Sequence, residues 1–249
     1  APAAGIIYAA LGPDPAFALN AASFLVSAAV LAGLRLPATP TSVARRGWVR
    51  DAAHGARFLA ADRLLRALAV GQLLAALSAG ATSALLVVLA RDHLDLAPSR
   101  YGLLLGAIGL GAALGPLVLT RLITDPRRPM FVFGPFLLRG LIDLVLGAAT
   151  ALPVAMAALL AYGLGTSTGA VTYNSLLQAH TPAEVRGRIF ASLDLLWQLG
   201  RLLSIAIGGI VADTLGISAV YYAGGALLLL AALIGWTTAV TEPNRRGPA

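Results

Sequence analysis

Long apolar runs alternate with short polar stretches along this chain. A helix that crosses a bilayer needs about 20 mostly apolar residues. Seven runs meet this length, at residues 17–36, 67–90, 101–119, 130–149, 152–177, 189–211 and 217–240. A shorter apolar stretch, residues 1–11, is followed by Gly12, Pro13, Asp14 and Pro15, a composition that predicts a turn. The pattern predicts an all-α membrane protein, a multi-pass helical bundle.

The placement of arginine predicts how the bundle crosses the membrane. All 18 basic residues are arginine, and most of them form clusters on every second connection between apolar runs. The intervening connections hold only Arg91 and Arg100. Because cytoplasmic loops of membrane proteins are enriched in arginine and lysine, the loops around residues 50, 127 and 186 are predicted to be cytoplasmic. The loop around residue 95 is predicted to be external.

Composition excludes several other classes of protein. Hydrophobic residues make up 58% of the chain and charged residues 12%, against roughly 25% charged residues in soluble domains. The net charge of +7 is explained by the arginine-rich loops, so we expect no nucleic-acid partner. The chain has no cysteine, its three histidines fall in predicted loops, and it carries no HExxH motif or glycine-rich phosphate loop. We therefore expect no metal, no cofactor and no enzymatic activity.

The longest polar connection, residues 37–66, is predicted to be a cytoplasmic linker. It opens with a stretch rich in proline, threonine and serine and then becomes amphipathic. Its apolar face would carry Trp48, Ala52, Ala56 and Leu59, and its polar face Arg50, Asp51, His54 and Arg57. We expect a helix lying in the membrane interface, with a solvated connector as the alternative.

Two local patterns predict how helices begin and pack. The run at residues 101–119 carries five glycines at spacings that allow another helix to approach closely: Gly102, Gly106, Gly109, Gly111 and Gly115. A cytoplasmic loop motif precedes the next-to-last run and comprises Thr181, Pro182, Glu184, Arg186, Gly187 and Arg188. In this motif Thr181 is predicted to cap a helix that starts at Pro182, and Glu184 to complete a capping box.

Four ionisable side chains fall inside predicted membrane helices, where charge is expensive and indicates function by default. Arg139 and Asp143 are four residues apart and share a helix face, so we expect a structural ion pair, with a transport role as the alternative. Asp194 and Arg201 share a face about 10 Å apart along the axis, too far for direct contact. Arg201 lies deeper and is the stronger transport candidate, whereas Asp194 could be a solvated carboxylate near the cytoplasmic end.

Further polar side chains are candidates for lining a substrate path, and packing between helices is the alternative role for the hydroxyls. These candidates are Gln72, Ser78, Thr82, Tyr162, Thr168, Thr172 and Asn174. Beside Arg201, the ring of Trp197 and the amide of Gln198 suit an apolar, partly cationic or aromatic drug. Ordinary packing is the alternative for these two residues as well.

Several segments resemble one family. NSLLQAHTPAEVRGRIFASL, residues 174–193, resembles the loop between helices 10 and 11 of drug-efflux members of the major facilitator superfamily, in the branch of macrolide-efflux and enterobactin-exporter-like proteins. GGIVAD, residues 208–213, resembles the end of helix 11, and residues 101–122 resemble helix 8 with the basic loop after it. GARFLAADRLLRAL, residues 55–68, is similar to the entry into helix 7. Residues 1–28 resemble the end of helix 5 followed by helix 6.

The resemblance implies that the chain is the C-terminal portion of a twelve-helix transporter whose N-terminal half is mostly missing. Residues 1–36 would be the end of helix 5 and helix 6, and residues 37–66 the linker. Residues 67–241 would be the C-terminal six-helix bundle and residues 242–249 a cytoplasmic tail. The helix that carries Arg139 and Asp143 would be the ninth, which is usually peripheral to the cavity.

We therefore expect a multi-pass secondary transporter of the plasma membrane, with proton-coupled export of hydrophobic or amphipathic small molecules such as drugs. The expected partners are the lipid bilayer, the small-molecule substrate, protons and the missing N-terminal half, against which the bundle would rock. A siderophore or metabolite exporter of the same fold is one alternative. A non-transporting membrane scaffold or receptor is another, and the absence of lysine excludes a retinal protein.

Overall fold

The structure is a computed structural model that describes residues 13–34, 57–97, 100–122 and 129–240. Within these ranges the chain forms helices and their connections, and no β-strand. The chain divides into two compact units, residues 1–47 and residues 48–249. The prediction of an all-α protein is confirmed.

The first unit contributes one described helix, α2 (Pro13–Gly33), which is apolar along most of its length. The predicted turn is wrong for Pro13, Asp14 and Pro15, which form the first turn of α2. Proline is tolerated there because the first helical N–H groups have no partner within the helix. The carboxylate of Asp14 also complements the helix dipole. Gly12 and the apolar stretch before it lie outside the described residues.

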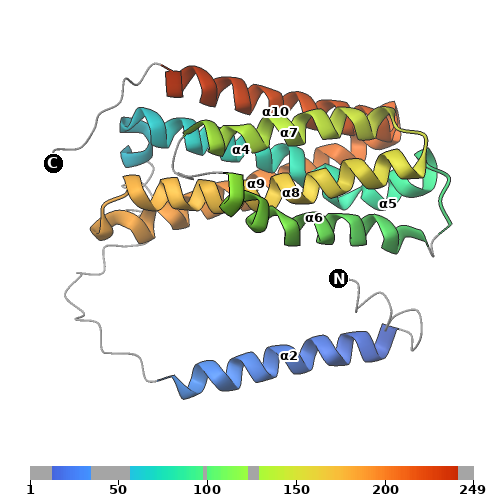
Figure 1. The fold of residues 1–249 in the computed structure, drawn as a ribbon, viewed down its shortest axis with the longest axis horizontal. Coiled ribbons are helices and arrows are strands. Elements are labelled where there is room, and N and C mark those ends of the chain that lie inside the picture. Colours follow the sequence, from blue (N-terminus) through green and yellow to red (C-terminus); the bar gives the residue numbers. More distant parts are fainter. Residues whose placement is uncertain (1–12, 35–56, 98–99, 123–128, 241–249) are drawn as a thin grey trace. The chain divides into compact units, whose positions relative to one another are not determined.

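The second unit is a helical bundle, called the bundle below (Figure 1). Its helices are α4 (Arg63–Ala84), α5 (Leu86–Val88), the π-helical turn η1 (Leu89–His93), α6 (Tyr101–Leu122), α7 (Pro129–Ala148), α8 (Leu152–His180), α9 (Ala183–Leu215) and α10 (Ile217–Val240). Six of these helices are long and apolar enough to cross a membrane. This confirms the last six of the predicted runs.

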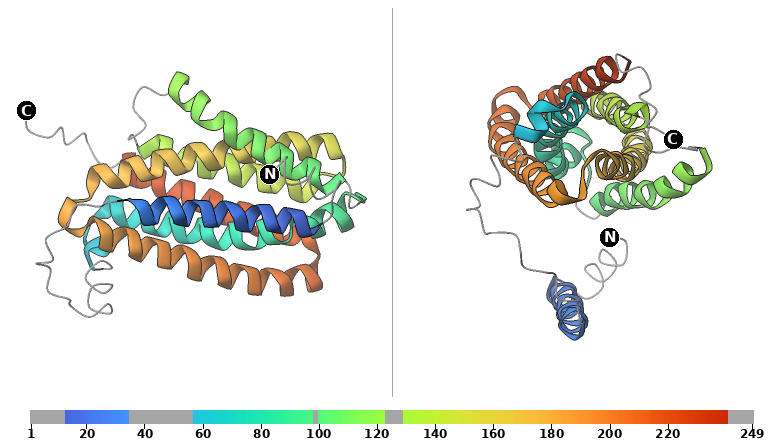
Figure 2. Two further views of the ribbon diagram at one scale, coloured as in Figure 1. Left: turned by 90° about the horizontal axis from the view of Figure 1, so that it is seen from below. Right: turned by 90° about the vertical axis from the view of Figure 1, so that its left-hand side faces the viewer.

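The long helices pack in a series that differs from their order in the sequence. Helix α6 packs on α8, α8 on α7, α7 on α10, α10 on α4, and α4 on α9. Figure 2, in its right-hand view, shows these helices nearly end-on. The series places α6 and α9 at its two ends, and α9 is the least buried of the six helices.

The entry into the bundle starts earlier than predicted. Residues 57–61 are helical, and α4 begins at Arg63. Asp62 caps α4, because its Oδ1 accepts a hydrogen bond of 2.8 Å from the Leu65 N–H. Leu59, assigned to the apolar face of the predicted interfacial helix, is buried in the bundle. Residues 48–56 of that predicted helix lie outside the described residues.

The predicted continuous helix over residues 67–90 is broken near its end. Leu85 adopts a turn conformation, and after α5 the chain forms the π-helical turn η1. The Leu94 N–H donates to the Leu89 carbonyl over 3.0 Å, the wider spacing of a π-helix. Asp95 then takes a positive φ of 48°, a conformation that aspartate tolerates better than most residues.

Helix α9 is longer than the predicted run. Its 33 residues span roughly 50 Å at 1.5 Å per residue, which exceeds the bilayer core of about 30 Å. Gly216 follows with a φ of 85°. This left-handed conformation suits glycine and allows the chain to reverse directly into α10.

The prediction that glycines allow close helix packing is confirmed for Gly111 and Gly115. A Cβ at Gly111 would overlap the Leu160 carbonyl, and one at Gly115 would lie 3.0 Å from the Leu164 carbonyl oxygen. Both contacts join α6 to α8, and Gly163 of α8 faces α6 in the same way. Gly102, Gly106 and Gly109 have no such neighbour within 4 Å.

Candidate functional site

Buried polar side chains form a layer in the middle of the bundle, between two hydrophobic clusters. On α7, Arg139 and Asp143 flank Ile142 of the second cluster and follow Phe136 of the first. The other members lie on α4, α8 and α9. We call the set the polar layer: Ser78, Thr82, Arg139, Asp143, Thr168 and Ser204.

Asp143 is only 1% exposed and lies against α4 and α10. Its Oδ2 accepts a hydrogen bond of 3.1 Å from the Ser78 hydroxyl on α4, and its Oδ1 has no hydrogen-bond partner. On the α10 side stands Gly224, where an added Cβ would lie 3.3 Å from Oδ2 and 3.0 Å from the Ser78 hydroxyl oxygen. Glycine at this position therefore leaves room for the carboxyl group.

Arg139 is 7% exposed and reaches toward α8. Its Nη2 donates to the Tyr162 hydroxyl over 3.0 Å, and its Cζ lies 4.9 Å from the centre of the Tyr162 ring. This combines a hydrogen bond with a cation–π contact. Its Nε is buried without a hydrogen-bond partner.

Arg139 and Asp143, predicted to form an ion pair, interact electrostatically, but the hydrogen bonds of both side chains go to other helices. Helical side chains lean toward the N-terminus, so an arginine placed four residues before an aspartate must bend back to reach it. Acid-before-base is the favourable order for a pair at this spacing. The two charged groups instead bond to different helices, α8 and α4.

Most of the other predicted polar candidates bond within their own helices. Thr82 donates to the Ser78 carbonyl over 3.0 Å, and Thr172 to the Thr168 carbonyl over 3.0 Å. Asn174 is exposed and donates to the Ala170 carbonyl of α8 over 2.8 Å. Gln72 is half-buried on α4. Such self-satisfied hydroxyls are typical of helix packing.

Helix α9 carries a second polar group, which lies on the surface of the bundle. Asp194, Gln198 and Arg201 are all exposed, and their spacings of four and three place them on one face. We call these three residues the α9 stripe. Trp197, one residue before Gln198, is half-buried against the first hydrophobic cluster. The stripe therefore borders the buried face of α9.

The buried face of α9 packs closely on α4 through small residues. A Cβ at Gly80 would lie 2.5 Å from the Arg201 carbonyl oxygen, and one at Gly200 would lie 3.0 Å from the Ala76 Cβ. The Ser204 hydroxyl accepts a hydrogen bond of 2.9 Å from the Ala81 N–H and donates to the Leu77 carbonyl. Ser204 thus inserts between two groups of α4 that are four residues apart.

The loop between α8 and α9 differs in detail from the predicted motif. Helix α9 begins at Ala183 with Pro182 as its N-cap, and the Thr181 hydroxyl is buried without a hydrogen-bond partner. Thr181 therefore does not cap α9. It ends α8, and its carbonyl accepts a hydrogen bond of 3.2 Å from Arg186. The Glu184 side chain lies outside the described residues, and Gly187 is exposed on the first turns of α9.

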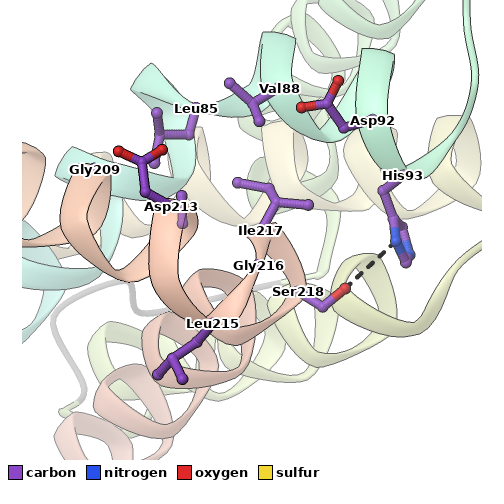
Figure 3. Close-up of a pocket in the computed structure, with 11 residues that line it drawn as sticks. Leu85, Val88, Asp92, His93, Gly209, Asp213, Leu215, Gly216, Ile217 and Ser218 are labelled. Atoms are coloured by element: carbon purple, nitrogen blue, oxygen red, sulfur yellow. Dashed lines mark hydrogen bonds between the residues drawn. The ribbon is translucent and has the colours of Figure 1, made fainter.

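A pocket of about 400 Å³ lies at the other end of α9, between η1 and the turn into α10 (Figure 3). Its polar side chains include Asp92, His93, Asp213 and Ser218. The Ser218 hydroxyl lies 3.4 Å from His93 Nδ1, as the dashed line in Figure 3 shows. Asp213 follows Arg201 by twelve residues, about 18 Å along the helix. The pocket is thus separate from the α9 stripe.

Several residues of these sites were not predicted from the sequence. Ser204, Tyr221 and Gly224 were not singled out, although Tyr221 is 1% exposed and donates to the Thr82 carbonyl over 2.8 Å. A serine or glycine in an apolar helix gives little signal by itself. The small residues at positions 200, 204 and 208 are spaced by four, a pattern that could have indicated the α4–α9 contact.

Six of the described helices are long and apolar enough to cross a membrane, which is typical of a multi-pass membrane protein. Residues 1–246 match the family described as "Transmembrane secretion effector". The chain therefore belongs to this family of MFS-type transporters.

Among curated proteins, the chain is similar to the "Uncharacterized MFS-type transporter YfiS" of Bacillus subtilis (strain 168). The two are 26% identical over 248 residues, which cover 92% of this chain and 57% of YfiS. The chain thus spans little more than half the length of that relative. No solved structure matches the chain significantly.

Proposed function

We propose that the chain is the C-terminal part of a proton-coupled exporter of hydrophobic or amphipathic small molecules in the plasma membrane. Residues 1–36 would belong to the N-terminal half of the transporter, and the cytoplasmic linker would begin at residue 37 and end before α4, which starts at Arg63. The six-helix C-terminal half would follow from α4 to residue 241, and residues 242–249 would form a cytoplasmic tail. Membership of the transporter family and the 57% share of YfiS that the chain covers support this proposal.

The main support for the proposal is the exposure of the α9 stripe. Its guanidinium and carboxylate are exposed on a helix that is long and apolar enough to cross a membrane. Lipid would penalise a guanidinium in mid-membrane by at least about 2.5 kcal/mol. The stripe is therefore expected to face water or another part of the transporter.

The arrangement of residues around α9 supports a substrate path along the stripe. The half-buried Trp197 ring borders the stripe on the side of α4, whereas the exposed Leu195, Leu199 and Leu202 lie on its other side and are expected to face lipid. Apolar surface with a few polar groups suits a hydrophobic or amphipathic molecule. In transporters built from two helical halves the substrate binds between the halves near the midplane.

The test is export by the full-length transporter in cells loaded with ethidium, a fluorescent amphipathic cation. Arg201→Gln removes the charge, and Arg201→Lys keeps the charge but loses the planar fork. We expect both variants to reach the membrane, with export reduced in Arg201→Lys and nearly lost in Arg201→Gln. Arg100→Gln, which removes an exposed charge outside the long helices, should export like the parent.

If Arg201→Gln exports ethidium at the rate of the parent, Arg201 has only a packing role. The α9 stripe would then no longer support the proposal. Absence of any ethidium export by the parent, at normal abundance, would contradict the proposed substrate class. Export that does not respond to a collapsed proton gradient would contradict the proposed coupling.

A further inference from the structure

We propose that Asp143 is a proton-binding site and that its ionisation moves the Arg139 guanidinium from Tyr162 on α8 to Asp143 on α7. The proposal rests on the proposed function, because it names the residue at which the coupling proton would bind. It also assigns a role to a buried group that the α9 stripe does not explain.

The hydrogen bonding around Asp143 fits a neutral carboxylic acid. An ionised carboxylate has about four acceptor sites to satisfy, and burying one without partners is expensive. Here Ser78 donates to Oδ2 over 3.1 Å, while the buried Oδ1 has no partner. A proton on Oδ1 would remove the unpaired charge and leave only a neutral hydroxyl unsatisfied.

The hydrogen bonding around Arg139 fits the same state. The Arg139 guanidinium donates a hydrogen bond of 3.0 Å to the Tyr162 hydroxyl and lies over the face of the Tyr162 ring. An ionised Asp143 four residues away would compete for this guanidinium, since opposite charges attract strongly at low dielectric. The observed contact with Tyr162 is therefore expected while Asp143 holds its proton.

Other groups near Asp143 offer no competing partner. On α4 the facing side chains are the hydroxyls of Ser78 and Thr82, and on α10 the position is occupied by Gly224. Tyr221 of α10 lies close enough to interact electrostatically with Asp143, but its hydroxyl already donates to the Thr82 carbonyl over 2.8 Å. Among the described residues that face Asp143, Arg139 is thus the available cation.

The proposed step is a simple proton transfer. The O–H bond of the Asp143 carboxylic acid breaks and the proton passes to water, which leaves a carboxylate. The Arg139 guanidinium then breaks its hydrogen bond with the Tyr162 hydroxyl and pairs with the Asp143 carboxylate. The guanidinium and the carboxylate are both charged and both belong to α7. Because the Tyr162 contact joins α7 to α8 and the Asp143 contact lies within α7, the proton would control an interhelical bond.

The test uses dicyclohexylcarbodiimide, an apolar reagent that adds to protonated carboxyl groups, on the purified full-length protein in detergent. Mass spectrometry of the digested protein reports labelling at Asp143 across a pH series. We expect labelling to fall about tenfold per pH unit above a midpoint, as for a single titrating group. No substrate is needed, so the result does not depend on export.

Three variants test the exchange of partners. Arg139→Gln removes the partner of the ionised form and should move the labelling midpoint to higher pH. Tyr162→Phe removes the hydrogen bond that holds Arg139 in the protonated form and should move the midpoint to lower pH. Tyr173→Phe is the matched control, because this tyrosine lies on the same helix and its buried hydroxyl has no hydrogen-bond partner; it should leave the midpoint unchanged.

Opposite shifts in Arg139→Gln and Tyr162→Phe, with a parental midpoint in Tyr173→Phe, would support the proposal. Absence of label on Asp143 in the folded parent at any pH would overturn it, and so would shifts in the same direction. Expected labelling without proton-driven export would contradict the proposed function and leave the proton site standing. Proton-driven export without labelling of Asp143 would contradict the proposed proton site and leave the proposed export function intact.

Discussion

Asp143 of α7 and Asp194 of α9 are two carboxylates within apolar helices of the bundle, and their surroundings differ sharply. Asp143 on α7 is enclosed by α4 and α10, with a serine hydroxyl on one oxygen. Asp194 on α9 is exposed beside Gln198 and Arg201. The buried Asp143 leaves no room for a side chain at position 224, where glycine is present. The exposed Asp194 is not enclosed in this way.

The difference separates two tasks that a transporter has to combine. A site that binds a proton benefits from a dry, fixed environment, because small changes in partners then change its charge state. A surface that meets many hydrophobic or amphipathic substrates benefits from exposed groups that are not locked by hydrogen bonds. We assign the first task to the polar layer and the second to the α9 stripe.

The largest expected effect comes from filling the space beside Asp143. Gly224→Leu would place a Cβ 2.9 Å from Thr82 Cγ2 and 3.3 Å from Asp143 Oδ2, and overpacking typically costs about 1–3 kcal/mol or more. We expect a strong loss of folded protein, measured as the monodisperse fraction after detergent extraction. Gly209→Leu is the control on α9, since an added Cβ there meets nothing within 4 Å. Equal losses in both variants would contradict the contrast between interior and surface.

A smaller effect is expected from the hydroxyl that ties α9 to α4. Ser204→Ala removes the contacts with the Ala81 N–H and the Leu77 carbonyl, which should destabilise the protein by about 1 kcal/mol. The measurement is the thermal unfolding midpoint in detergent. Thr214→Ala removes an exposed hydroxyl that bonds within α9 and should change stability by less than about 0.5 kcal/mol. A loss of stability in Thr214→Ala that equals or exceeds the loss in Ser204→Ala would contradict the proposed importance of the Ser204 hydrogen bonds.

The least perturbing prediction concerns orientation. In this cysteine-free chain, Asp95→Cys should react with an impermeant maleimide in whole cells, and Arg186→Cys should react only after the membrane is opened. The reason is that arginine-rich loops resist translocation, while the loop at Asp95 has few arginines. The reverse pattern would invert the topology and place Asp194 near the external end of α9.

The sequence predicted the helices well but their ends and partners poorly. Hydropathy alone located the six long helices of the bundle, because about 20 apolar residues have few alternatives to crossing a membrane. The helix starts at Pro13 and Ala183 were missed, since proline chemistry suggested a turn in the first case and a cap at Thr181 in the second. Both helix starts depend on backbone geometry, and the same local sequence is compatible with more than one such geometry.

The contacts of the polar layer were beyond prediction from spacing. Arg139 and Asp143 share a helix face, yet their partners Tyr162 and Ser78 are 23 and 65 residues away in the chain. Such contacts depend on which helices become neighbours. The packing series from α6 to α9 decides this, and no local pattern in a single sequence specifies that series.

We propose that the α9 stripe faces a water-filled path and that the neighbouring leucines do not. Single cysteines at positions 198 and 201 in the stripe, and at positions 199 and 202 beside it, test this directly in the full-length protein in membranes. We expect a water-soluble maleimide to react with the cysteines at 198 and 201 and to leave those at 199 and 202 unmodified. Reaction at 199 and 202 that equals or exceeds reaction at 198 and 201 would contradict the claim.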